Sequence, residues 1–204
     1  MCLNRICLSL ILILSGINAG FSQHKLYLKT NLLPYGAAIV NVGAEIDIVP
    51  HLSFNLPIYY SAWDYFKQTT KFRTFAIQPE LRYWPKCDHD GNNGFFAGAH
   101  FGLAYYNLAF GGAFRYQDHK SKIPAIGGGI SAGYRFPLNS NKRLGMEISL
   151  GAGIYHASYD KFDNTPKTSE GMLTGHFKKT YYGIDQANLS LTYSFDINKK
   201  GGKK

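Results

Sequence analysis

A strict alternation of apolar and polar side chains near the end of the chain constrains the fold more than any other feature. The sequence ANLSLTYSF occupies positions 187–195, so every odd position there is apolar and every even position is polar or small. A period of two places the two kinds of side chain on opposite faces of a β-strand. The strand, predicted over Tyr181–Ile197, therefore needs an apolar environment on one face and a polar one on the other.

The aromatic end of this strand resembles a known export signal. Tyr193-Ser194-Phe195 is similar to the carboxyl-terminal assembly signal of bacterial outer-membrane β-barrels, with Ser190 where that signal usually has Gly. The resemblance implies that this strand ends on the periplasmic side of an outer membrane.

The first residues are typical of a signal peptide. Arg5 supplies a positive charge, Leu8–Leu14 form a short apolar run, and Asn18–Gln23 are mostly small or polar, as cleavage regions are. We expect cleavage near Ser22. This divides the chain into a signal peptide (1–22), an outer-membrane domain (23–198) and a basic, solvated tail (199–204).

Composition limits the covalent cross-links, membrane helices and binding partners that the chain can have. Only Cys87 remains once Cys2 and Cys7 are removed with the signal peptide, so we expect no intramolecular disulfide. After that peptide no run of about 20 apolar residues occurs, which is the length of a membrane-spanning helix. The formal net charge is +9, but the Lys and Arg residues are spread through loops and tail. We therefore expect no nucleic-acid partner for this exported chain.

Eight segments of the mature chain have strand character. They are Lys25–Leu33, Ala38–Val49, Leu52–Trp63, Arg73–Trp84, Phe95–Leu108, Ile123–Phe136, Leu144–Ser158 and Tyr181–Ile197. Short turns and long polar stretches alternate between them, as periplasmic turns and extracellular loops do in outer-membrane proteins. We predict an all-β fold, namely an eight-stranded antiparallel transmembrane β-barrel with a side-chain-filled lumen.

The alternation also predicts which side chains face the lumen. In the seventh segment the even positions from Leu144 to Ile154 face lipid, and the odd positions, including Glu147, face inward. Pro79 interrupts the fourth segment, because proline has no N–H for a strand ladder. We expect no change of register there, since a shift would move Glu80 and Arg82 into lipid, where Arg costs roughly 2–4 kcal/mol near the midplane.

Six charged side chains are predicted to form a network in the lumen. They are Lys29, Glu45, Glu80, Arg82, Arg135 and Glu147. An eight-stranded barrel has an interior just wide enough for side chains to fill, and unpaired buried charges are costly, so these groups should pair. Arg135 and Glu147 flank the Pro137–Arg143 turn at nearly equal distances and are the best single pair. We predict a plugged interior in place of a pore.

Several blocks together resemble a domain-of-unknown-function family of small outer-membrane proteins in the Bacteroidetes. They are KTNLL at 29–33, QPELRYW at 78–84, GFFAGAH at 94–100, GGGISAGYRF at 127–136 and YDKF at 159–162. The resemblance implies an eight-stranded barrel, sometimes associated with fimbrial or adhesin gene clusters. It brings no catalytic residues with it.

Two patterns fall short of metal sites. Asp88–Asn93 has the alternating oxygen ligands of a calcium loop, but Asn93 and Ala99 stand where that loop needs Gly and Glu. Cys87 and His89 supply two of the four ligands that a structural zinc site needs. We expect a polar periplasmic turn, no metal and no other cofactor.

A catalytic alternative rests on His156, Ser158 and Asp185. All three have lipid-facing parity on neighbouring predicted strands, and a nucleophile, a base and an acid can form a triad. The arrangement is similar to the outer-membrane lipid A deacylase, another eight-stranded barrel with a lipid-facing His-x-Ser pair. The alternative function is thus a lipid-modifying esterase. In the non-catalytic interpretation, the same residues only lie at the outer rim of the barrel.

The long loops carry net positive charge and several aromatic side chains. Lys67 and Lys71 lie in one loop, and Arg115 and Lys120 lie in another. Such loops suit lipopolysaccharide and other anionic outer-leaflet headgroups, or a surface or fimbrial protein. We expect a monomeric, non-catalytic outer-membrane protein of a Gram-negative bacterium that serves envelope integrity or surface interaction.

Overall fold

The computed structural model of the chain describes residues 25–64, 70–86, 92–110, 113–164 and 171–197. These residues form ten β-strands and one short 3₁₀ helix, η1 (Leu33–Ala37). The strands are β1 (Lys25–Asn31), β2 (Val40–Val49), β3 (Leu52–Asp64), β4 (Thr70–Ile77), β5 (Glu80–Tyr83), β6 (Gly94–Phe110), β7 (Phe114–Asp118), β8 (Ala125–Pro137), β9 (Leu144–Asp163) and β10 (Met172–Asp196). Within the described residues no helix has the length and apolar character needed to cross a membrane.

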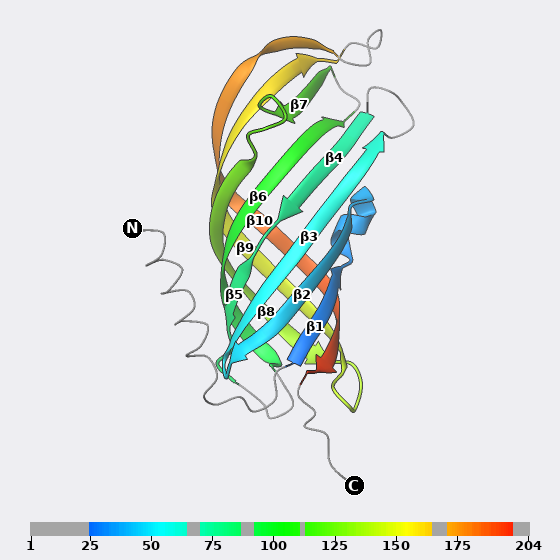
Figure 1. The fold of residues 1–204 in the computed structure, drawn as a ribbon, viewed down its shortest axis with the longest axis vertical. Coiled ribbons are helices and arrows are strands. Elements are labelled where there is room, and N and C mark those ends of the chain that lie inside the picture. Colours follow the sequence, from blue (N-terminus) through cyan, green and yellow to red (C-terminus); the bar gives the residue numbers. More distant parts are fainter. Residues whose placement is uncertain (1–24, 65–69, 87–91, 111–112, 165–170, 198–204) are drawn as a thin grey trace, which may run out of the picture.

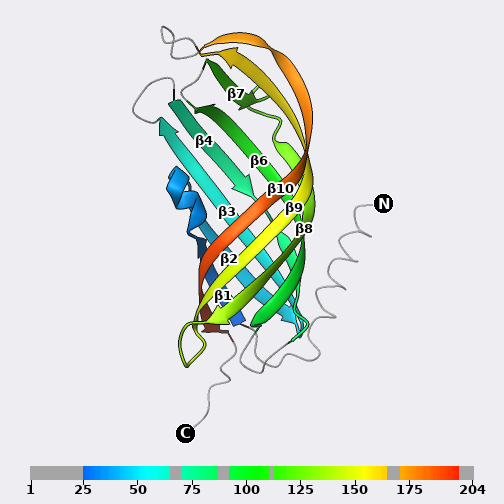
Figure 2. The same ribbon diagram turned by 180° about the vertical axis from the view of Figure 1, so that it is seen from behind.

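The strands form one antiparallel sheet that closes on itself. β1 pairs with β2 on one side and with β10 on the other, and β10 pairs in turn with β9. From β2 the ring continues through β3 to β4 and β5, then through β6 to β8 and back to β9. Figures 1 and 2 show these strands tilted around one long axis, with β1 and β10 side by side at the seam.

The predicted count of eight strands is wrong for two local reasons. The fourth predicted strand is divided at Gln78 and Pro79 into β4 and β5, because proline cannot donate to the ladder. The register is nevertheless the same on both sides: Ile58 pairs with Ile77, and Asn55 pairs with Glu80. In addition, β7 lies in a stretch that the sequence analysis assigned to a loop.

β9 and β10 are longer than predicted and extend beyond the ring. Most of the predicted loop Tyr159–Thr180 continues these two strands, which pair from Asp163 opposite Met172 onward. β7 pairs with the same part of β9 and makes this extension three-stranded. Figure 1 shows the extension arching past the end of β4 and β6. Three strands that pair by their backbones can therefore hold side chains in place outside the ring.

The two faces of the sheet have opposite character, in the sense that the alternation predicts. On β9, Glu147 and Ser149 are 1 % and 2 % exposed, whereas Leu150 and Ile154 are 58 % and 47 % exposed. Among the described residues, the buried hydrophobic side chains are Tyr27, Trp84, Phe96 and Ala109, while many more of the buried side chains are polar or charged. The molecule is thus polar inside and apolar outside.

Candidate functional site: the charged interior of the closed sheet

The six charged side chains predicted for the interior are brought together by the ring. Lys29 comes from β1, Glu45 from β2, Glu80 and Arg82 from β5, Arg135 from β8 and Glu147 from β9. Each is an inward position of its strand, because its neighbours in sequence carry the outer apolar side chains. We refer to these six residues as the interior ion network. It contains equal numbers of positive and negative side chains.

Two glutamates form the centre of the interior ion network. Glu45 Oε2 lies 2.6 Å from Lys29 Nζ, 3.0 Å from Arg82 Nη1 and 2.5 Å from Arg135 Nη2. Glu147 contacts the same three cations, with each closest contact at 2.8 Å. Each of the two carboxylates therefore contacts all three cations of the interior ion network.

Several of these ion pairs cross the interior. Arg135 and Glu147 sit opposite each other on neighbouring strands, as the sequence analysis expected of them. Arg82 on β5 contacts Glu147 on β9, and Arg135 on β8 contacts Glu45 on β2, although neither pair of strands is adjacent. The interior ion network therefore bridges opposite walls of the ring.

Glu80 joins the network through Arg82 and neutral donors. Arg82 Nη2 lies 2.6 Å from Glu80 Oε2, which also accepts a hydrogen bond of 3.0 Å from Asn55. The Ser131 hydroxyl donates to the other carboxylate oxygen. Both oxygens of this buried carboxylate are therefore satisfied, as a group in a confined interior requires.

Aromatic rings cover the arginines at the same level. Arg82 lies over the ring of Phe96 at 4.3 Å, and Arg135 lies over Tyr27 at 4.4 Å and over Trp84 at 4.6 Å. Trp84 and Phe96 are fully buried, and their ring centroids are 4.8 Å apart. Both residues continue the inward parity of Arg82 and His100, but this aromatic pair is not among the interior residues predicted from the sequence. Cations and aromatic rings are therefore stacked on one another at this level of the interior.

A chamber of about 390 Å³, lined by both apolar and polar side chains, lies further along β9 than the interior ion network. Its lining includes Asn31, Tyr59, Gln78, Tyr155, Asp185 and Gln186. His100 Nε2 lies 2.6 Å from Asp185 Oδ2 beside this chamber. Within the described part of the chain, His100 Nδ1, Asp185 Oδ1 and the amide group of Gln186 lack a hydrogen-bond partner. Buried polar atoms in a chamber of this size are normally satisfied by water.

The position of Asp185 differs from the one predicted for it in the catalytic triad. The register of β10 against β9 shifts between Ile184 and Gln186, so Asp185 is the extra residue of a β-bulge. The bulge turns its side chain inward to His100, and the prediction that it faces outward is wrong. The alternation of apolar and polar residues in the sequence does not reveal that one extra residue is inserted in the strand.

His156 and Ser158 stay on the outer face, away from that acid. His156 Nδ1 lies 2.9 Å from the Thr180 hydroxyl, and both His156 and Ser158 line an outer pocket with Lys178. Residues two apart on one face of a strand stand roughly 6.6 Å apart along it, so the pair is not preset for proton transfer. The wall of the ring separates the pair from Asp185, and the structure does not assemble the triad.

Other sequence predictions fall on residues that the structure does not describe. They concern the signal peptide at 1–22, the turn containing Cys87 and Asp88, the loop residue Lys67 and the tail at 199–204.

Fold and interior together define the class: an all-β protein whose closed antiparallel sheet is apolar outside and encloses a network of ion pairs. The chain belongs to DUF3575, a family of proteins of unknown function, whose profile matches residues 6–195. The predicted membership of a family without assigned function is thereby confirmed. Comparison with curated proteins finds no match, and neither does comparison with solved structures.

Proposed function

We propose that this chain is a non-catalytic outer-membrane β-barrel with a closed interior. The observation that carries the proposal is the distribution of side chains around the ring, which is apolar outside and polar inside, the reverse of a water-soluble protein. Leu150 and Ile130 on the outside are 58 % and 72 % exposed, whereas Arg135 and Glu147 inside are each 1 % exposed. Exposed apolar bands of this extent are unfavourable in water and favourable in lipid.

The number of strand positions around the ring is compatible with this proposal. β4 and β5 occupy one position between β3 and β6, and β7 belongs to the extension. Eight strand positions then surround the interior, an even number, as in bacterial outer-membrane barrels. An interior of this size is filled by side chains.

A passive role follows from the closed interior. The side chains of the interior ion network bridge the ring, and Trp84 and Phe96 are fully buried inside it. Ions would have to displace paired charges to pass, which is costly in a confined space. We therefore propose a role in envelope integrity, or in surface interaction with lipopolysaccharide or a surface protein, in preference to transport.

The proposal is tested by a matched pair of substitutions and cell fractionation. Leu150 lies in the outer apolar band, and Leu173 is similarly exposed, at 47 %, but lies in the extension. Arg at the midplane of a barrel costs roughly 2–4 kcal/mol and much less near the interfaces. Leu150→Arg should reduce the outer-membrane, heat-modifiable form of the protein strongly, and Leu173→Arg should not.

Two results would contradict the proposal. One is recovery of the wild-type chain as a soluble periplasmic protein whose gel mobility is the same before and after boiling. The other is equal tolerance of Leu150→Arg and Leu173→Arg, because the outer band would then not contact lipid.

A further inference from the structure

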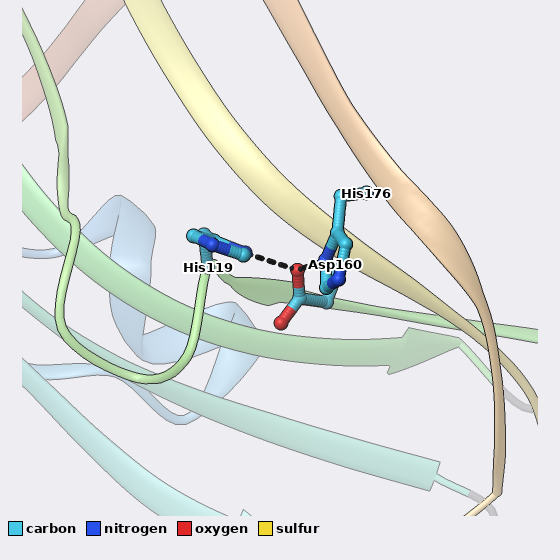
Figure 3. A group of neighbouring side chains, drawn as sticks. All are labelled: His119, Asp160 and His176. Atoms are coloured by element: carbon cyan, nitrogen blue, oxygen red, sulfur yellow. Dashed lines mark hydrogen bonds and ion pairs between the residues drawn. The ribbon is translucent and has the colours of Figure 1, made fainter.

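Three side chains outside the ring converge on one point of the extension. His119 follows β7, Asp160 lies on β9, and His176 lies on β10 directly opposite Asp160 in the strand register. The backbone N–H of His119 donates to the carbonyl oxygen of Ser158 at 3.0 Å, which holds the turn after β7 against β9. Figure 3 shows the two imidazole rings pointing toward the Asp160 carboxylate from either side.

The potential ligand atoms of this trio are close together. Asp160 Oδ1 lies 2.6 Å from His119 Nδ1 and 2.5 Å from His176 Nδ1. One ligand atom from each of the three side chains lies within 4.8 Å of the others. The two rings are nearly perpendicular, at 84°, with centroids 4.6 Å apart. Two nitrogens and one oxygen are thus presented to a common centre.

The remaining carboxylate oxygen is fixed by the backbone. Asp160 Oδ2 accepts a hydrogen bond of 3.0 Å from the N–H of Lys120. Such a bond orients a carboxylate and leaves its other oxygen for a ligand role, as outer-shell partners of metal sites do.

The charge state of Asp160 suits a ligand. An Asp side chain ordinarily titrates at a pKa of about 3.9, well below neutral pH. The carboxylate is therefore ionised at neutral pH.

We propose that His119, Asp160 and His176 bind one Zn²⁺ ion. Two imidazole nitrogens and one carboxylate oxygen make a set that borderline transition metals prefer, whereas Ca²⁺ and Mg²⁺ prefer oxygen alone. The His176 side chain is 54 % exposed, so a fourth, solvent ligand has access.

Small movements accommodate the ion. Zn–N and Zn–O distances near 2.1 Å in a tetrahedron place ligand atoms roughly 3.4 Å apart. Each imidazole nitrogen needs to move away from Asp160 Oδ1 by less than about 1 Å, which small rotations of both histidine side chains supply. The bound ion cross-links the turn after β7 to β9 and β10.

No metal site is predicted from the sequence, and these three residues show no ligand spacing along the chain. His119 and Asp160 are 41 positions apart, and Asp160 and His176 are 16 apart. Only the pairing of β7, β9 and β10 brings them together.

The test uses the full chain without a histidine tag, folded in detergent and stripped with EDTA. Titration calorimetry with Zn²⁺, together with metal analysis after desalting, should give one zinc per chain. His176→Ala and Asp160→Asn should each weaken binding by more than the roughly 10–100-fold that loss of an outer-shell partner costs. Excess Ca²⁺ or Mg²⁺ should not displace the zinc.

His156→Ala is the matched control. His156 lies on the same strand and the same face as Asp160 but outside the trio, so this variant should bind zinc like the wild type. Heat-modifiable gel mobility shows that each variant is folded, and His176→Gln replaces His176→Ala if the latter fails. A folded wild-type protein that takes up no zinc would overturn the proposal. Zinc binding that survives all substitutions in the trio would overturn it equally.

Discussion

Arg135 Nη2 lies 2.8 Å from Glu147 Oε2, and the two residues are direct partners in the register of β8 and β9. The pair is one link of a network in which two carboxylates serve three cations. Because the network connects opposite walls of the ring, its loss affects more than one strand pair. Stability should therefore depend on single charges within it.

Glu147→Ala is expected to destabilise the protein by about 3–5 kcal/mol, because three buried cations lose a shared partner. The measurement is the free energy of unfolding in denaturant, followed in detergent by tryptophan fluorescence. Asp64→Ala is the control, since its pair with Arg73 is 2.6 Å long but about half exposed. Such exposed pairs contribute at most about 1 kcal/mol. Similar losses in both variants would contradict the role of the buried network.

Gly129→Ala should weaken the closure of the ring between β8 and β9. A Cβ atom at Gly129 would lie 2.6 Å from Gly153 Cα and closer still to the Ala152 carbonyl oxygen. Both obstacles are backbone, so the strands must separate, and overpacking of this kind costs about 1–3 kcal/mol. Gly36→Ala, with no atom within 4 Å of the added Cβ, should unfold like the wild type. The midpoints of thermal unfolding compare the two variants.

The strand pattern and the two faces of the sheet could be predicted from the sequence, because both follow from the period of two. The six charged interior residues could be predicted in the same way, since a charge at an inward position has to be paired. Trp84 and Phe96 carried the same parity signal, but aromatic residues occur on both faces of this sheet and did not stand out.

Two features could not be predicted, for physical reasons. The β-bulge at Asp185 adds one residue to β10 without changing the composition of the strand, so parity assigned the wrong face. The His119–Asp160–His176 trio depends on three strands pairing beyond the ring, within stretches polar enough to resemble loops.

Ser158→Ala is expected to leave both stability and lipid A unchanged. Ser158 lies on the outer face without its predicted acid, because Asp185 points to His100. Loss of a hydroxyl at a surface position changes the free energy of unfolding by less than about 0.5 kcal/mol. Mass spectrometry of lipid A from cells expressing each form checks the second expectation. Removal of an acyl chain by the wild type, and not by this variant, would instead favour the esterase.

Purified protein in planar bilayers should give no steady current of porin size. Arg82 and Arg135 are held against carboxylates across the interior, so an ion meets paired charges and stacked rings. Single-channel recording at neutral pH tests this expectation. Stable, large conductance steps would show that the interior ion network opens in a membrane.

The claim that the apolar outer face of the sheet contacts lipid is tested most directly by a fluorescent probe on a single introduced cysteine. The background for this variant lacks Cys2, Cys7 and Cys87. Leu150→Cys places the probe on the outer apolar band, and Asn141→Cys places it in the exposed turn between β8 and β9. In vesicles, brominated acyl chains should quench the probe at position 150, and aqueous iodide should quench the probe at position 141. Iodide quenching of both probes, with no effect of brominated lipid at position 150, would contradict a lipid-facing outer surface.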